Sequence, residues 1–359
     1  MNNLFETLKD KIRNNQRISD AEALALFESN DLLAIGGLAA EVNRRKNGDR
    51  VYFNVNRHIN YTNVCVNQCI FCAFSKVEGE DEGYTLALDD IREKAEEAVA
   101  AGATEIHSVG GLHPRLPFSF YLDMLRTIKT VSPLLHIKAF TAVEIDYFAR
   151  ISKTSTLEVI HALQEAGLGS MPGGGAEIFA KEVRDKICPE KISGERWLEV
   201  IEQVHNAGLK SNATMLFGHL ENYADRVDHM HRLRELQDRT GGFQSFIPLA
   251  FQPDNTRVPG ATGVGGVDAL KTLAIGRIYL DNFQHVKAYW VMVGMKIAQT
   301  ALCFGVNDLD GTVIEEQIGH DAGADSPQVI GKERIINLIR KAGKTPVERD
   351  TLYNELKVY

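Results

Sequence analysis

Three cysteines lie within eight positions of one another in the segment INYTNVCVNQCIFCAFSK, residues 59–76. Cys65, Cys69 and Cys72 follow the spacing C-x3-C-x2-C. A structural zinc site requires four ligands, usually from paired C-x2-C units, and the sequence has no second pair. A redox-active or nucleophilic cysteine does not require a triplet. The segment therefore offers three thiolate ligands to a metal site and no fourth one.

Three thiolates on one tight loop can hold three corners of a [4Fe–4S] cluster and leave the fourth iron open. An open iron can bind the amino and carboxylate groups of S-adenosylmethionine. Reduction of the cluster then breaks the bond from the sulfonium to the adenosyl carbon and gives a reactive carbon radical. Phe71 would place an aromatic ring beside the cluster, where an adenine can pack. A non-catalytic scaffold that binds a cluster or zinc is the alternative from another class.

Composition and charge exclude several other functions. The chain has 359 residues, of which 44% are apolar and 25% charged, as in ordinary globular proteins. A net charge of -8 argues against binding of nucleic acid. The sequence contains no uninterrupted apolar run of about 18 residues, and its N-terminus does not have the pattern of a signal peptide. Five cysteines fit no disulfide framework, so we expect a cytoplasmic protein.

The elements that must position the cysteines follow from hydrophobic periodicity. Residues 1–50 have the spacing of helices, and after them short β-rich runs alternate with amphipathic helices. Eight such runs are predicted as strands: VYFNVN (51–56), EIHSVGG (105–111), HIKAFTA (136–142), LGSMPGG (168–174), KSNATMLFG (210–218), SFIPLAF (245–251), HVKAYW (285–290) and ALCFGV (301–306).

Strands that alternate with helices predict an α/β fold, a parallel (β/α)8 barrel of the TIM type. We divide the chain into an N-terminal helical layer (1–50), the barrel (51–306) and a C-terminal cap (307–359) that belongs to the same domain and ends in two short helical segments. The functional face of such a barrel lies at the C-terminal ends of the strands. The cysteines follow the first predicted strand, so they fall on this face.

The segment resembles the radical S-adenosylmethionine superfamily, whose hallmark is C-x3-C-x-aromatic-C after the first barrel strand. Cys65, Cys69, Phe71 and Cys72 match this pattern. The resemblance implies one [4Fe–4S] cluster and S-adenosylmethionine as co-substrate.

Other elements of the superfamily pattern fall at later strand ends, and the resemblance implies that they bind the cofactor. Gly110 and Gly111 match the glycine pair that meets the methionine amino group, although Leu112 replaces the glutamate that often follows. Gly218 and Glu221 match a G-x-x-E element near the adenine. Ile247 and Leu249 would flank the base, and Glu144 would face the ribose hydroxyls or pair with a nearby base. Each glycine can also report simple turn chemistry.

The resemblance narrows to enzymes of the futalosine route to menaquinone and their deazaflavin-synthesising relatives. The segments VGGLHP (109–114), IKAFTAVEI (137–145) and DLDGTVIEE (308–316) are similar to the branch that adds the adenosyl radical to 3-[(1-carboxyvinyl)oxy]benzoate, with rearrangement and decarboxylation, to give 6-amino-6-deoxyfutalosine. The alternative is the cyclase of the same route, which uses the radical to abstract hydrogen from dehypoxanthine futalosine.

This reaction implies an aromatic dicarboxylate substrate and an electron donor such as flavodoxin or ferredoxin. Two carboxylates require cations or directed donors. The candidates for substrate binding at the reactive face are Arg57, His58, His113, Arg115, Lys138 and His219, and those that we assign to catalysis are Arg57, His113, Lys138 and His219. The alternative for Arg57 and His58 is support of the cluster loop, and the alternative for His113 and His219, which lie beside glycine turns, is a structural role. Lys138 lies inside a strand, and a buried lysine needs a partner.

Overall fold

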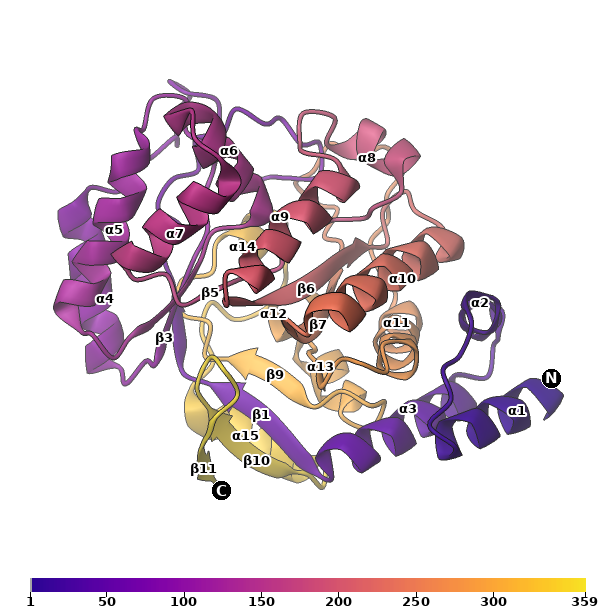
Figure 1. The fold of residues 1–359 in the computed structure, drawn as a ribbon. Coiled ribbons are helices and arrows are strands. Elements are labelled where there is room, and N and C mark those ends of the chain that lie inside the picture. The colour runs from indigo at the N-terminus through magenta and orange to yellow at the C-terminus, as the bar shows by residue number, and fades with distance from the viewer. Residues whose placement is uncertain (1) are drawn as a thin grey trace.

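Helices form the N-terminal part of the computed structural model, which describes residues 2–359. The helices here are α1 (Asn2–Arg13), α2 (Asp20–Glu28) and α3 (Leu32–Asn47). Ser19 caps α2 by accepting a hydrogen bond from the backbone N–H of Glu22, whose side chain reaches back to complete a capping box. Lys271, in the barrel, donates a hydrogen bond to the carbonyl oxygen of Phe27 in α2 (2.9 Å). The predicted helices of residues 1–50 are confirmed, and they pack against the side of the barrel (Figure 1).

A curled sheet of parallel strands forms the barrel wall. In the described residues it has the order β2-β3-β4-β5-β6-β7-β8, and every neighbouring pair is parallel. These strands are β2 (Asn56–His58), β3 (Glu105–Ser108), β4 (His136–Ala139), β5 (Ser170–Met171), β6 (Lys210–Phe217), β7 (Phe243–Ala250) and β8 (His285–Val286). The predicted parallel α/β class is confirmed.

Helices between the strands cover the outside of this sheet (Figure 1). They are α4 (Leu88–Ala100), α5 (Phe118–Val131), α6 (Ala142–Ser152), α7 (Thr156–Ala166), α8 (Lys181–Ile187), α9 (Gly194–Asn206), α10 (Tyr223–Thr240), α11 (Gly266–Tyr279), α12 (Trp290–Val293) and α13 (Met295–Ala301). Their apolar faces are buried in one continuous core; Ile91, Leu125, Ile160 and Leu233 are 0% exposed. Burial of these faces is the main stabilising contribution to the barrel.

The eighth position of the barrel is filled differently from the prediction. The run 301–306 was predicted as a strand, and this is wrong: α13 ends at Ala301 and a turn through Gly305 (φ +87°) follows. A short apolar run does not distinguish a strand from a buried helix end. The next segment, β9 (Asp308–Gly311), fills the gap instead. A single parallel bridge joins Asp308 in β9 to Lys287 on one side of the barrel wall, and another joins Ile314, three residues after β9, to Arg57 on the other side.

A second sheet lies below the barrel and joins the two halves of the chain (Figure 1). Its order is β11-β10-β1-β9, where β1 is Arg50–Asn54, β10 is Thr345–Arg349 and β11 is Glu355–Val358. The prediction that the chain ends in two short helical segments is therefore correct for the helices and wrong for the chain end. Helices α14 (Ile318–Asp321) and α15 (Lys332–Lys341) are present, but the chain ends in a pair of strands. The three-part division of the chain stays a prediction.

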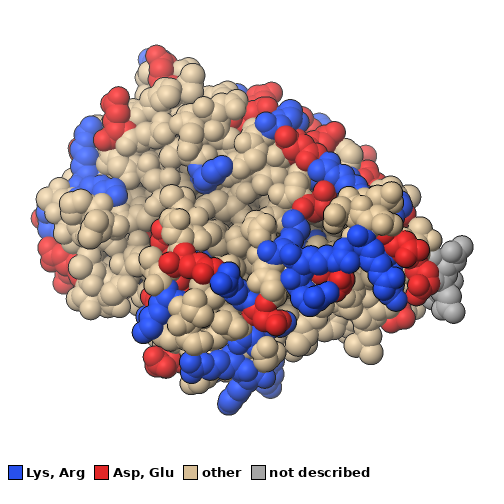
Figure 2. All heavy atoms as spheres, turned by 60° about the horizontal axis from the view of Figure 1, so that its bottom comes forward, with Lys and Arg blue, Asp and Glu red and all other residues tan. Residues whose placement is uncertain are grey.

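The surface carries charges of both signs. On the face shown in Figure 2, lysine and arginine side chains lie interspersed with aspartate and glutamate. In residues 2–359, no helix is both long and apolar enough to cross a membrane.

Candidate active site

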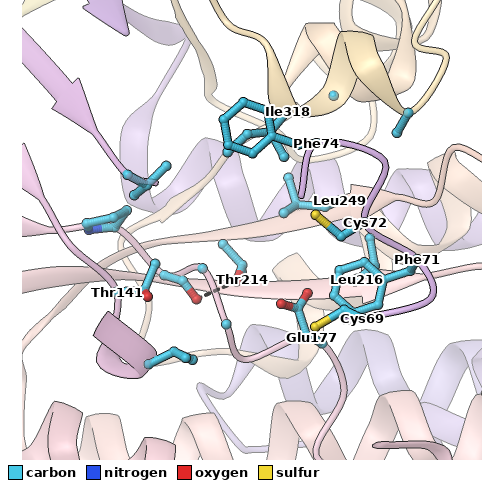
Figure 3. Close-up of a pocket in the computed structure, with 18 of the residues that line it drawn as sticks. Cys69, Phe71, Cys72, Phe74, Thr141, Glu177, Thr214, Leu216, Leu249 and Ile318 are labelled. Carbon is cyan, nitrogen blue, oxygen red and sulfur yellow. Dashed lines mark hydrogen bonds between the residues drawn. The ribbon is translucent and has the colours of Figure 1, made fainter. Parts of the chain in front are cut away.

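A cavity of about 300 Å³ opens at the C-terminal ends of the barrel strands. The cysteine loop and the loop that follows β3 lie together on one side, and Thr141, which follows β4, lies across the open space from the cysteines (Figure 3). Residues of β6 and β7 supply an apolar surface, which includes Leu216, Ile247 and Leu249. Ile318 in α14 lies over the mouth beside Phe74. The cavity therefore lies where the barrel architecture predicts a functional site.

Backbone hydrogen bonds fix the cysteine loop to its neighbours. Val66 donates to the carbonyl oxygen of Leu112 after β3, and Ile70 donates to that of Ile187 at the end of α8 (both 3.0 Å). Within the loop, the N–H of Cys72 donates to the carbonyl oxygen of Cys69 (3.1 Å), which forms a tight turn. The loop is thus held by two separate elements of the barrel.

The thiols of Cys65, Cys69 and Cys72 are unpaired and line the cavity. Figure 3 shows the sulfur atoms of Cys69 and Cys72 turned into the open space on either side of Phe71 and Leu216. Burial raises the pKa of Cys65, and it raises the pKa of Cys69 to about 12. An activated nucleophilic cysteine has a lowered pKa, so this wall does not have that character. A metal ligand instead exchanges its proton for the metal.

The donor set fits a cluster better than a single ion. In residues 2–359, no three His, Cys, Asp or Glu side chains meet closely enough to hold one metal ion. A [4Fe–4S] cluster takes one thiolate on each of three irons, so its ligands stand apart around a larger object. Three thiols spread along one cavity wall meet this requirement. Cys65, Cys69 and Cys72 are the residues that would hold the cluster.

Two glycines after β3 allow the backbone to approach the cysteine loop. A Cβ at Gly111 would overlap the carbonyl oxygen of Val64, and one at Gly110 would lie 2.7 Å from the ring of Tyr61. Both glycines line the cavity, as predicted from the sequence. The close approach gives a physical reason for glycine at these positions.

Glu144 also lines the cavity, but its carboxylate is already engaged. It accepts hydrogen bonds from the hydroxyl of Tyr61 (2.6 Å) and the backbone N–H groups of Thr141 (2.7 Å) and Gly110 (3.3 Å). Burial raises the pKa of this carboxyl group, while these donors act in the opposite direction. Glu144 therefore fastens α6 to the glycine loop, and its contact with a ribose stays a prediction.

The loop after β6 closes on itself instead of facing the cavity. Glu221 accepts hydrogen bonds from the backbone N–H groups of Gly218 (2.6 Å) and His219 (3.0 Å) and from Arg226 (2.9 Å). The ring of His219 accepts from the N–H of Leu220 (2.7 Å), and its side chain is fully buried. None of Gly218, His219 and Glu221 is part of the cavity lining. Burial and these contacts give the three residues structural roles in this loop.

His113 and Arg57 also lie outside the cavity lining. The Nδ1 atom of His113 accepts from the backbone N–H groups of Arg115 (3.1 Å) and Leu116 (3.2 Å), and burial lowers its pKa. The guanidinium of Arg57 is paired with Glu97 (2.6 Å) and Glu315 (2.9 Å). The structure does not bring either side chain to the substrate position that we predicted for it.

Lys138 is the predicted catalytic candidate that does line the cavity, and it lies in the barrel interior. Sequence reasoning missed five other acidic or basic side chains in the same cavity: Glu177, Lys191, Lys287, Asp310 and Glu316. Lys191 lies 2.6 Å from Glu177 and 4.8 Å from the centroid of the Phe71 ring. Burial opposes its charge, but Glu177 together with Cys69 and Cys188 outweighs this effect, so the pKa of Lys191 is raised. The sequence did contain a signal for Lys287: like Lys138, it is a charged residue within a run that was predicted as a strand.

Comparison with known proteins agrees with the geometry. The chain matches the radical SAM superfamily over residues 59–233 and the CofH/MqnC C-terminal region over residues 240–359. It is 45% identical to aminodeoxyfutalosine synthase of Thermus thermophilus over 98% of this chain and 96% of the relative. It is 39% identical to cyclic dehypoxanthine futalosine synthase of Streptomyces coelicolor over 99% of this chain and 90% of the relative.

The fold also agrees with a solved structure. The crystal structure of HydG, a maturase of the [FeFe]-hydrogenase, superimposes with a TM-score of 0.77 at 16% identity, over 97% of this chain and 76% of that chain. At this identity the likeness concerns the fold alone. The cysteine wall, the barrel and the sequence matches lead to one conclusion: the chain belongs to the radical SAM superfamily, in the group with a CofH/MqnC C-terminal region.

Proposed function

We propose that the protein acts as an aminodeoxyfutalosine synthase. The observation that carries this proposal is the 45% identity to the Thermus thermophilus enzyme of that name over nearly the full length of both chains. Identity to the cyclic dehypoxanthine futalosine synthase is lower, at 39%. Membership of the superfamily implies a [4Fe–4S] cluster and S-adenosylmethionine.

The proposed reaction joins the adenosyl group to 3-[(1-carboxyvinyl)oxy]benzoate. The bond from sulfur to the adenosyl carbon breaks and methionine leaves, and a bond forms from that carbon to the vinyl carbon. Migration of the aryl ring from oxygen to carbon and loss of the carboxylate as carbon dioxide then give 6-amino-6-deoxyfutalosine. The last step returns the one electron taken up in the first, so the overall reaction is redox-neutral. When bound, the reduced cluster supplies the electron that breaks the first bond. We assign this electron to a donor such as flavodoxin or ferredoxin, and the reaction to the cytoplasm.

The chain's own residues have three tasks in this reaction. Cys65, Cys69 and Cys72 hold the cluster on one wall of the cavity. Gly110 and Gly111 bring the backbone close to that wall, because a side chain at either position would overlap Tyr61 or Val64. Leu216, Ile247 and Leu249 give the cavity an apolar surface that excludes water from a reactive carbon centre. Close positioning of the two reacting carbons supplies much of the rate enhancement.

The test is an anaerobic assay with the reconstituted enzyme. The protein is loaded with iron and sulfide and mixed with dithionite, S-adenosylmethionine and 3-[(1-carboxyvinyl)oxy]benzoate, and the products are analysed by mass spectrometry. We expect 6-amino-6-deoxyfutalosine and one carbon dioxide per product. Accumulation of only 5'-deoxyadenosine and methionine would show that the radical forms but that the substrate is a different one. Uncleaved S-adenosylmethionine with an assembled cluster would contradict an enzymatic role.

A further inference from the structure

The floor of the cavity is polar and charged, although the interior of such barrels is usually filled by branched apolar side chains. We use "the floor" for the following inward-facing residues of the barrel strands and the segments that continue them: His58, His107, Lys138, Asn212, Lys287 and Asp310. All six line the same cavity as the cysteines. An ionised group buried at this depth is costly unless it is paired, so a charged floor calls for a functional explanation.

Strand register places half of the floor at one level. His58 on β2 is the register partner of His107 on β3, and His107 is the partner of Lys138 on β4. On the other side of the gap in the sheet, Lys287 follows β8 and forms a bridge with Asp308, two residues before Asp310. The floor is therefore built by strands from both ends of the curled sheet.

Two lysines supply the positive charge of the floor. Lys138 lies 2.8 Å from Glu105, and Lys287 lies 3.0 Å from Asp310. Both lysines are 2% exposed. The contact of Lys287 with Asp310 is a hydrogen bond and uses one of the three N–H donors of the ammonium group. The contact of Lys138 with Glu105 is an ion pair; burial lowers the pKa of Lys138, and Glu105 acts in the opposite direction. Each lysine is therefore compensated by a carboxylate and has N–H donors left for the cavity that it lines.

Asp310 is held in position by a local constraint. Its backbone has φ +66°, which is unfavourable for a residue other than glycine. The backbone N–H of Asp310 donates to the carboxylate of Asp308 (2.6 Å), and Arg349 donates to the other oxygen of that carboxylate (2.8 Å). The position of the Lys287–Asp310 pair is thus determined by the fold before any ligand arrives.

The two histidines of the floor leave an unused polar atom. The rings of His58 and His107 stack with centroids 4.4 Å apart and an interplanar angle of 3°. His58 is only 5% exposed, yet its Nε2 atom has no hydrogen-bond partner within the described residues. Burial lowers the pKa of both rings, so both are neutral. An unpartnered buried atom beside the cavity indicates that a polar ligand group completes the floor.

We infer that the floor binds the ring carboxylate of the aryl substrate between the ammonium groups of Lys138 and Lys287, with His58 as an additional polar contact. This inference rests on the proposed function, which makes the substrate an aromatic dicarboxylate. The lysines lie on or next to the strands, whereas the cysteines lie on a loop beyond the strand ends. A ring carboxylate on the floor therefore directs the enol ether toward the cysteine wall, where the adenosyl carbon must react.

The test compares two ligands with two proteins. The ligands are 3-[(1-carboxyvinyl)oxy]benzoate and its ring amide, 3-[(1-carboxyvinyl)oxy]benzamide. The proteins are the wild type and the double variant Lys287→Met with Asp310→Asn, each loaded with cluster and S-adenosylmethionine. The double change removes both charges of one pair, so no unpaired charge stays buried. Asparagine also tolerates the positive φ at position 310.

Equilibrium binding is measured by anaerobic calorimetry. We expect wild type to bind the acid at least about 30-fold more tightly than the amide, because the amide loses charge-assisted hydrogen bonds. In the double variant this preference should fall to less than about threefold. The second pair gives an independent variant, Lys138→Met with Glu105→Gln, for which we expect the same loss of preference. Lys271→Met is the matched control, because Lys271 is buried outside the cavity.

Iron and sulfide content and the visible absorption after anaerobic reconstitution serve as the folding and cluster control and should match those of the wild type in all variants. An unchanged preference for the acid in both folded double variants would overturn the floor as the carboxylate site. Wild type that prefers the acid but forms no 6-amino-6-deoxyfutalosine would support the floor and contradict the proposed function. Wild type that binds neither ligand would contradict both.

Discussion

The cavity has two parts that are built in opposite ways: the mouth, which is the cysteine loop of residues 65–72, and the floor. The mouth depends on a contiguous loop, in which Cys65, Cys69 and Cys72 lie within eight residues and are held by backbone hydrogen bonds. The floor collects single side chains from strands that are distant in the sequence, such as Lys138 and Lys287. A site for a cofactor shared by a whole superfamily can be carried by one motif. A site for an individual substrate depends instead on which side chains the complete barrel brings together.

The largest effect is expected at the mouth. Replacement of Cys65, Cys69 or Cys72 by alanine should abolish cluster assembly, because each of these thiolates would bind one iron of the cluster. Iron and sulfide content and the visible absorption after anaerobic reconstitution measure this effect. Cys303→Ser is the control, since Cys303 is exposed and distant in sequence from the loop. Full activity in any of the three alanine variants would contradict the assignment.

At the floor, replacing one partner of an ion pair should lower the free energy of unfolding more than replacing both partners. Lys138→Met leaves the fully buried carboxylate of Glu105 without its partner, and we expect a loss of about 3–5 kcal/mol in the free energy of unfolding. The double variant with Glu105→Gln should recover most of this loss. Urea denaturation of the three proteins measures both values. Equal stability of the single and double variants would mean that the pair is not electrostatically coupled.

Close packing behind the mouth gives a smaller effect. Gly111→Ala places a methyl group against the carbonyl oxygen of Val64, next to Cys65. We expect a loss of about 1–3 kcal/mol and a severalfold lower iron content after reconstitution. Gly37→Ala, in α3, is the matched control, because a Cβ there meets no atom within 4 Å. That change should stabilise the protein by about 0.5–1 kcal/mol. A similar response at both positions would remove the special role of Gly111.

The last effect concerns pH and comes from buried histidines, of which His58 and His107 belong to the floor and His136 begins β4. Burial lowers the pKa of His136 to about 4, and it also lowers those of His58 and His107. As the pH falls below about 6.5, the unfolded chain takes up protons before the folded protein does, so the free energy of unfolding decreases. Each such group contributes a slope of about 1.4 kcal/mol per pH unit. His136→Gln should reduce this slope between pH 6 and pH 4, as measured by thermal unfolding. An unchanged slope would show that His136 does not titrate on unfolding.

Much of the fold and of the mouth was predictable from the sequence. The alternation of strands and helices predicted the parallel barrel, and Phe71, Gly110, Gly111, Ile247 and Leu249 all line the cavity as predicted. These predictions succeeded because they depend on local spacing and on the rule that strand ends gather at one face. The role of each residue toward the cofactor stays a prediction.

Other predicted site residues do not line the cavity, and the reasons are physical. His219 and Glu221 follow a strand end, but they hydrogen-bond their own loop instead of the cavity. His113 likewise holds backbone N–H groups. A polar residue near a glycine turn can satisfy local backbone groups or face a ligand, and spacing does not distinguish the two. The pairing of Lys287 with Asp310 depends on β9, which was placed at the wrong residues, so the floor was not recognised.

The second sheet has a consequence for how the protein is made. Strand β1 lies between β10 and β9, so its partners come from nearly the opposite end of the chain. During synthesis, β1 leaves the ribosome early and then waits on the order of tens of seconds for both neighbours. Its backbone groups are open to wrong partners throughout this time. We therefore expect nascent chains that stop before Thr345 to require chaperones. The last fifteen residues, which contain β10 and β11, complete the hydrogen bonding of β1 and end this exposure.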